Sequence, residues 1–351
     1  MMIAERESIG WHSIFENQQG EIEMLSSIHR REFLQTVSAG AAALSIGGTA
    51  LAGKTKIVKT TYTYKTVGKL EIKADVYRAD DNVVRPVAIW IHGGALIMGG
   101  RGGVSHRVKD DLLGDGYVLV SIDYRLAPET QLAEIVSDVE DAYRWVHEKG
   151  PGLFLADTKR IAVLGGSAGG YLTLTAGFRA EPRPTVLVAF WGYGDLVGDW
   201  YSKPSEFYRK QPLVKKSDFA QIVGGAAVTN GSVNSNQRRA FYLYCRQNGV
   251  WPQRVSGFDP IEQAKQFAPF EPVRGVTKEY PPTLLIHGTV DTDVPYEQSV
   301  LMEKQFKQHQ VPHKFVTVPN AGHGLSKGDP KLIHDAYAQV LPFIHKYMKP
   351  E

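Results

Sequence analysis

Residues 161–169 read Ile161-Ala162-Val163-Leu164-Gly165-Gly166-Ser167-Ala168-Gly169. The first four residues are an apolar run, and the last five form a G-x-S-x-G pentapeptide. This pattern predicts a buried strand, a sharp turn and a helix. A serine that attacks a carbonyl must stand clear of the backbone on such a turn, and Gly165 and Gly169 permit it because they have no Cβ to clash. Ser167 is therefore a candidate nucleophile.

Apolar and helical patterns alternate along the rest of the chain. Near-continuous apolar runs, typical of parallel strands covered on both faces, occupy residues 86–91, 117–122, 161–164, 186–190 and 283–286. Helical patterns lie between and after them, at 134–148, 169–180, 297–308 and 331–348. Two period-two segments, 60–66 and 70–76, predict an antiparallel pair at an edge. The alternation predicts the α/β class, with a doubly wound, mostly parallel sheet.

One long segment interrupts this alternation. Roughly 90 residues separate the runs 186–190 and 283–286, and they are rich in aromatic residues, Lys, Arg, Asn and Gly. A connection of this length is rarely structureless in a compact domain. We expect a mainly helical cap, inserted at about residues 196–275, over the strand ends where such a sheet binds its ligand.

The base and the acid that would serve Ser167 follow two later strands. His323 lies between glycines just after the strand-like residues 314–318, where it is free to reach over the sheet. Asp291 and Asp293 both follow the run 283–286 and compete for the role of the acid that orients His323. We favour Asp291 because it comes first after the strand, and we expect Asp293 to cap the following turn.

The segment His92-Gly93-Gly94-Ala95 follows the predicted strand 86–91. Negative charge that develops on a carbonyl oxygen needs backbone N–H donors already aimed at it. Small residues let the backbone come close enough to provide them. We expect the N–H groups of Gly94, Ala95 and Ala168 to form an oxyanion hole, and His92 to order the loop through hydrogen bonds.

In this order the motifs resemble an α/β-hydrolase of the esterase/lipase class, most closely the hormone-sensitive-lipase-like carboxylesterases. The residues that carry the resemblance are 92–95, 123–129, 165–169, 287–291 and 322–324. The order Ser167, Asp291, His323 is that of α/β-hydrolases. The resemblance implies that Ser167 is the nucleophile, Asp291 the orienting acid and His323 the base.

Two departures bear on specificity and subfamily. Ala95 stands where the family has a third glycine, which we expect to narrow the acyl pocket and to disfavour tertiary-alcohol esters. The His-Gly-x-x-Asp context of Asp291 is shared with prolyl-oligopeptidase-like enzymes and polysaccharide acyl esterases. We expect residues 123–129 to be scaffolding, with charged side chains that brace the serine turn from behind.

The expected reaction is hydrolysis of a carboxylic ester through an acyl-enzyme, without a metal or organic cofactor. Short-acyl esters and glycan or aryl esters, as small molecules or glycan-linked, are the predicted substrates. A prolyl-oligopeptidase-like peptidase is one alternative, but it would be expected to carry a β-propeller, for which residues 53–85 leave no room. A non-catalytic binding module is the other alternative, but it would be expected to have lost a triad member.

Composition narrows the class of protein further. The chain has 351 residues, 43% of them hydrophobic, which is enough to bury a large core. Its 40 basic and 37 acidic residues leave a net charge of +3, which argues against a nucleic-acid binder. Cys245 is the single cysteine, so an intramolecular disulfide and a Cys-rich zinc site are excluded, and we expect a small buried residue there.

The N-terminal residues resemble a bacterial twin-arginine export signal. Arg30 and Arg31 precede the mildly apolar stretch 36–51, which ends in Ala50-Leu51-Ala52. We expect residues 1–52 to be a leader, with Met24 as an alternative start, and the hydrolase domain to occupy 53–351. The leader predicts transport by the twin-arginine translocase to the periplasm or the exterior. The stretch is short for a membrane span and no cysteine directly follows it, so no stable membrane anchor is expected.

Overall fold

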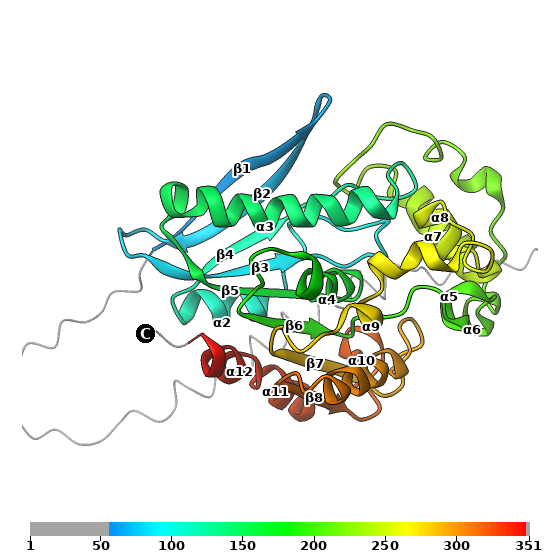
Figure 1. The fold of residues 1–351 in the computed structure, drawn as a ribbon. Coiled ribbons are helices and arrows are strands. Elements are labelled where there is room, and N and C mark those ends of the chain that lie inside the picture. Colours follow the sequence, from blue (N-terminus) through cyan, green and yellow to red (C-terminus); the bar gives the residue numbers. More distant parts are fainter. Residues whose placement is uncertain (1–55, 349–351) are drawn as a thin grey trace, which may run out of the picture. The chain divides into compact units, whose positions relative to one another are not determined.

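The computed structural model describes residues 56–348, in which eight strands form one sheet in the order β1-β2-β4-β3-β5-β6-β7-β8 (Figure 1). The predicted leader, residues 1–52, lies outside the described residues. The strands are β1 (Ile57–Val67), β2 (Leu70–Ala79), β3 (Arg85–Ile91), β4 (Val118–Ile122), β5 (Ala156–Gly166), β6 (Val186–Phe190), β7 (Thr283–Gly288) and β8 (His313–Val318).

Strand directions follow the sequence patterns. β1 and β2 form the predicted antiparallel edge pair, and β2 also runs antiparallel to β4. The other neighbours in the sheet are parallel. The residues of β4 and β6 are buried throughout, because helices cover both faces of the sheet there. The predicted doubly wound, mostly parallel α/β sheet is therefore confirmed.

The strands divide their side chains between two hydrophobic cores. On one face the core lies beneath α3 (Leu132–Phe154), α4 (Ala168–Arg179) and α10 (Glu297–Gln308). On the other face it lies beneath α2 (His106–Gly114), α11 (Pro330–Tyr337) and α12 (Val340–Tyr347). Successive residues of a strand point to opposite faces, so each apolar run supplies both cores.

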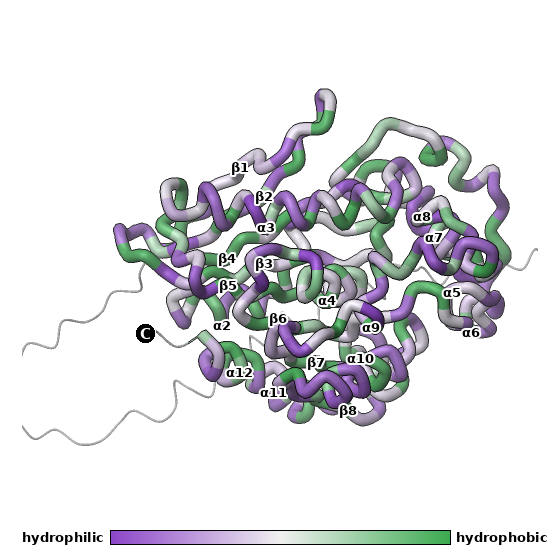
Figure 2. Tube along the Cα trace, in the orientation of Figure 1, coloured by the Kyte–Doolittle hydropathy of each residue, from purple (hydrophilic) through white to green (hydrophobic). Residues whose placement is uncertain are grey.

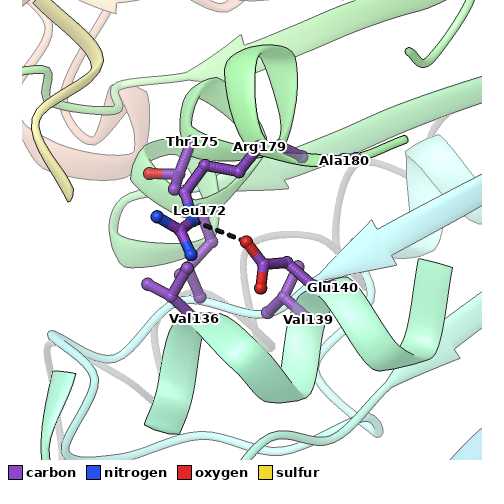
Figure 3. A pocket seen from close by; sticks show the side chains of 8 residues that line it. Val136, Val139, Glu140, Leu172, Thr175, Arg179 and Ala180 are labelled. Atoms are coloured by element: carbon purple, nitrogen blue, oxygen red, sulfur yellow. Dashed lines mark hydrogen bonds and ion pairs between the residues drawn. The ribbon is translucent and has the colours of Figure 1, made fainter. Parts of the chain in front are cut away.

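α3 and α4 pack against each other beside the sheet. Hydrophobic and hydrophilic residues alternate along α3 (Figure 2), as expected for a helix with one buried face. Figure 3 shows Val136 and Val139 of α3 near Leu172 of α4, with Arg179 Nε donating to Glu140 Oε1 at 2.5 Å. This contact holds α4, whose first residue directly follows Ser167.

Two helical features differ from the prediction. The predicted helix 331–348 is wrong as a single element, because α11 ends at Tyr337 and α12 begins at Val340. Pro342 explains the break: it has no N–H to donate to the carbonyl of Ala338, and its ring crowds that carbonyl. The sequence patterns also missed α2, a short helix of nine residues.

The cap contains only short helices apart from α7 (Ser235–Asn248). The other helical elements between β6 and β7 are α5 (Asp199–Ser202), α6 (Glu206–Arg209), η1 (Lys216–Phe219), α8 (Trp251–Ser256), η2 (Ala264–Phe270) and α9 (Pro272–Gly275). Many cap aromatics pack inward; Tyr201, for example, is buried and stacks on the buried Trp251 at 4.1 Å between ring centroids. Trp251 Nε1 also donates to Ala95 O at 3.2 Å, which ties the cap to the loop after β3.

Among residues 56–348, no helix has both the length and the apolar composition of a membrane span.

Candidate active site

Ser167 lies on the turn between β5 and α4 in a strained conformation, with φ 56° and ψ −122°. Its N–H donates to Phe190 O at 2.9 Å, which anchors the turn to β6. The neighbouring glycines are required by packing. A Cβ on Gly169 would lie 2.0 Å from Ile91 O, and one on Gly165 would lie 2.4 Å from Gly169 O. The predicted strand–turn–helix is thus present, and it holds the serine on a positive-φ residue.

The structure brings Ser167, His323 and Asp291 together. Ser167 Oγ lies 3.1 Å from His323 Nε2, and His323 Nδ1 lies 2.8 Å from Asp291 Oδ2. The three residues come from loops at the carboxyl ends of β5, β8 and β7, which are separated in sequence and meet at one edge of the sheet. This is the arrangement in which an imidazole can take the proton of a serine while a carboxylate orients it.

The carboxylate of Asp291 is almost fully buried, with 8% of the residue exposed. Its Oδ1 accepts hydrogen bonds from the N–H groups of Asp293 (2.8 Å) and Val294 (2.9 Å). Burial on its own would raise the pKa of Asp291, but hydrogen bonds from His287 and His323 lower it well below its ordinary value. Asp291 therefore carries a negative charge at neutral pH.

His287 is the histidine of the His-Gly-x-x-Asp motif, and no role of its own was assigned to it from the sequence. It is fully buried, and its Nε2 lies 3.0 Å from Val294 O and 3.3 Å from Asp291 Oδ2. Its Nδ1 lies 2.8 Å from Ser299 Oγ. A proton on Nε2 satisfies both oxygens that face it, with the Ser299 hydroxyl donating to Nδ1. The available signal was its position four residues before the acid, at the end of a buried strand.

Asp293 does not cap the following turn, so that expectation was wrong; Asp291 caps it instead. Asp293 Oδ1 accepts from Tyr208 Oη (2.7 Å), from Tyr242 Oη and from the Arg246 guanidinium (2.9 Å). Its Oδ2 lies 3.4 Å from His323 Nε2. The local sequence could not indicate this role, because the donors to Asp293 belong to α6 and α7 of the cap.

His323 is partly exposed, with 29% of its side chain accessible. Desolvation lowers the pKa of its imidazole, but the negative charges of Asp293 and Asp291 outweigh that effect. The positive charge of Arg246 opposes them more weakly. The net effect raises the pKa of His323 above its ordinary value of 6.5.

The loop after β3 lies directly against the serine turn. A Cβ on Gly93 would be 3.3 Å from Ser167 Cβ. Gly94 and Ala95 both have positive φ, and Gly94 O accepts from the N–H groups of Ile97 (2.9 Å) and Met98 (2.8 Å). The N–H groups of Gly94, Ala95 and Ala168 form no hydrogen bond with other groups in residues 56–348, which leaves them available to a ligand.

His92 orders this loop, as predicted. Its Nδ1–H donates to Gly93 O at 2.8 Å, and its ring stacks on Tyr124 at 4.2 Å between centroids. Burial lowers the pKa of His92, so the ring is neutral.

Within residues 56–348, no three His, Cys, Asp or Glu side chains lie in an arrangement that could hold a metal ion.

The charged residues of 123–129 do not brace the serine turn, which corrects that expectation. Asp123 accepts from the backbone N–H of Arg101 at 2.7 Å and so holds the loop after β3. Arg125 pairs with Asp138 of α3 at 2.7 Å. Glu129 pairs with Arg238 of the cap. These are contacts with residues distant in sequence, and no local pattern indicates them.

Cys245 is buried, as expected. It lies on α7, in the turn that precedes Arg246. Burial raises the pKa of its thiol well above the ordinary value.

Comparisons with known proteins agree with the fold. The BD-FAE family model matches residues 74–306, a span that includes Ser167 and Asp291 and ends before His323. A solved protein of unknown function from Staphylococcus aureus subsp. aureus Mu50 is similar, at 22% identity and TM-score 0.66 over 83% of this chain and 99% of that one. An esterase from Thermogutta terrifontis is similar at 19% identity and TM-score 0.57, over 84% of this chain and 94% of that one.

Curated relatives include a non-reducing polyketide synthase of Penicillium rubens, which is 29% identical over 68% of this chain and 11% of that protein. The chain thus spans about a tenth of the length of the curated relatives it matches. The resemblance drawn from the motifs is confirmed at the level of the α/β-hydrolase fold. The chain belongs to the BD-FAE family and has the α/β-hydrolase fold of esterases.

Proposed function

We propose that this chain hydrolyses carboxylic esters through an acyl-enzyme formed on Ser167. The observation that carries the proposal is the hydrogen-bonded line from Ser167 Oγ through His323 to Asp291, at 3.1 and 2.8 Å. Ser167 attacks the ester carbonyl while His323 Nε2 takes its proton and passes it to the leaving alcohol. Water then attacks the acyl-enzyme by the same route. Asp291 holds the Nδ1–H tautomer and stabilises the imidazolium.

In this proposal the N–H groups of Gly94, Ala95 and Ala168 stabilise the negative charge on the tetrahedral intermediate. Each such donor contributes about 100- to 1000-fold to the rate in comparable sites. The methyl group of Ala95 narrows the space beside them. We therefore propose that esters of tertiary alcohols are poor substrates.

The substrates we propose carry short acyl groups or are glycan or aryl esters. One aromatic side chain beside the serine supports this part of the proposal. The Trp191 ring lies edge-on to His323 at 6.4 Å between centroids, and its Nε1 borders the backbone at Gly166. This ring is only partly buried, and we propose that it offers a stacking surface to a sugar or an aryl group.

Labelling with a fluorophosphonate tests the nucleophile. The wild type should be labelled, and the variant Ser167→Ala should not be. Hydrolysis of p-nitrophenyl esters of increasing acyl length, beside acetylated xylan and feruloyl esters, tests the substrate class. Absence of labelling of the folded wild type, or a near-zero rate on every ester, would overturn the proposal. Cleavage of X-Pro peptides instead would indicate a peptidase.

We also propose that residues 1–52 direct export through the twin-arginine translocase to the periplasm or the exterior. The paired Arg30 and Arg31 ahead of an apolar stretch support this proposal. N-terminal sequencing of the exported protein should find cleavage after Ala52. Recovery of the uncleaved chain in the cytoplasm alone would contradict it.

A further inference from the structure

Hydrogen bonds from the cap converge on the carboxylate of Asp293, which faces the imidazole of His323. Two cap helices hold this side chain. Tyr208 of α6 donates to Oδ1 at 2.7 Å, and Tyr242 of α7 donates to the same oxygen. Arg246 of α7 donates from one guanidinium nitrogen to Oδ1 and to the backbone oxygen of Asp293, both at 2.9 Å.

Arg246 is itself held in place by its surroundings. It is 3% exposed, and the rings of Tyr201 and Tyr208 lie 4.9 and 4.8 Å from its guanidinium carbon. A buried guanidinium needs a compensating negative charge, and the paired carboxylate is Asp293. The direction in which Asp293 points is therefore set by the packing of the cap.

The two oxygens of Asp293 have different partners. Oδ1 accepts the three cap donors, so Oδ2 is left facing His323 Nε2 at 3.4 Å. Ser167 Oγ approaches the same nitrogen at 3.1 Å. A carboxylate in this position repels the lone pair of the neutral imidazole and attracts the N–H of the imidazolium. It therefore favours the protonated ring, which forms when Ser167 loses its proton.

We propose that Asp293, held by Arg246, Tyr208 and Tyr242, is a positioning residue for the esterase reaction: it stabilises the imidazolium of His323 from the Nε2 side. Asp291 does the same from the Nδ1 side, so the ring lies between two carboxylates. The Ser167 proton on Nε2 then has an acceptor in Oδ2 until it passes to the leaving alcohol. This inference rests on the function proposed above.

The charges around His323 determine the sign of the effect. Asp291 and Asp293 face the ring from the loop after β7, and each raises the pKa of His323. Arg246, from the cap, lowers it. His287 contacts the carboxylate of Asp291. Removing the charge of Asp293 while leaving the others in place must therefore lower the pKa of His323.

The test is an NMR pH titration of ¹⁵N-labelled His323, combined with the pH dependence of kcat/KM. In the wild type we expect the His323 pKa to lie above 6.5. In Asp293→Asn we expect it to fall by about one unit or more, because a charge within 4 to 6 Å typically has an effect of this size. The acid limb of kcat/KM should move to lower pH by the same amount, and kcat on the plateau should fall several-fold.

Asp335→Asn is the matched control, because Asp335 is a carboxylate on α11 that pairs with Lys331 at the surface. It should leave the His323 titration unchanged. A His323 pKa at or below 6.5 in the wild type would overturn the inference even if Asp293→Asn failed to fold. So would a folded Asp293→Asn protein with the wild-type titration. Failure of the proposed function has a different signature, since the titration does not depend on turnover or on labelling of Ser167.

Discussion

Replacing Gly169 with alanine is expected to damage both stability and catalysis. Helix propensity alone gives the opposite expectation, because Gly169 lies in the first turn of α4 and alanine is favoured in helices by about 1 kcal/mol. The added Cβ, however, would lie 2.0 Å from Ile91 O and 2.8 Å from His92 O. Ile91 is the last residue of β3, which pairing with β4 and β5 holds in place, and His92 directly follows it.

The size of the effect follows from the distance. Contacts of a Cβ below 3.0 Å essentially do not occur, so α4 and the end of β3 must separate by about 1 Å. Overpacking of this kind costs about 1–3 kcal/mol, which exceeds the gain in helix propensity. Ser167 precedes α4, whereas Gly94 and Ala95 follow β3, so the separation also misaligns the proposed nucleophile and the proposed N–H donors. A misplacement of about 1 Å can cost about 100-fold in rate.

The assay compares kcat/KM on p-nitrophenyl acetate with the midpoint of thermal unfolding. Gly152→Ala is the matched control, because Gly152 lies inside α3 and a Cβ added to it would have open space within 4 Å. The control should gain about 0.5–1 kcal/mol of stability and keep its activity. A Gly169→Ala protein with kcat/KM within threefold of the wild type and an unchanged midpoint would refute the argument.

Three further predictions follow from the site and its supports. Because the pKa of His323 is raised above 6.5 and only its neutral form accepts the serine proton, kcat/KM should rise with pH through a pKa above 6.5; a midpoint at or below that value would contradict this. Arg238→Ala should lower the free energy of unfolding in urea by about 3–5 kcal/mol, because it leaves the buried Glu129 carboxylate unpaired. The double variant Arg238→Met, Glu129→Leu should lose less stability, and equal losses in the two variants would contradict the reasoning. Cys245 should not react with a thiol reagent until the protein unfolds, because it is buried and its thiol pKa is raised; rapid modification of the native protein would show otherwise.

Much of the fold was predictable because burial leaves a local pattern. The apolar runs 86–91 and 186–190 correspond to β3 and β6 with bounds that agree within one residue. Strands covered on both faces read as uninterrupted apolar runs, whatever they pair with. The prediction of one helix at 331–348 failed because it also relied on this local pattern. The apolar periodicity continues through Pro342, whereas the helical hydrogen bonds are interrupted.

The candidate site was only partly predictable. Ser167, Asp291 and His323 were identified because each follows a predicted strand and two of them lie among glycines. The sequence could not show what Asp293 does, because its partners Tyr208 and Arg246 lie 85 and 47 residues away. Local sequence suggested that this carboxylate would accept hydrogen bonds from the backbone of the next turn. Instead it accepts them from side chains of α6 and α7.

The sequence alone determined the α/β sheet and the sharp turn that carries Ser167. Both follow from neighbouring residues: the spacing of apolar side chains predicts the buried strands and helices, and glycines without a Cβ permit the turn. The tertiary structure decided which carboxylate faces which nitrogen of His323. It also placed His287 behind Asp291 and directed the charges of 123–129 to the loop after β3, to α3 and to the cap. Hydrogen bonds and ion pairs depend on positions to within a few tenths of an ångström between residues that are remote in the chain, and no local pattern records those positions.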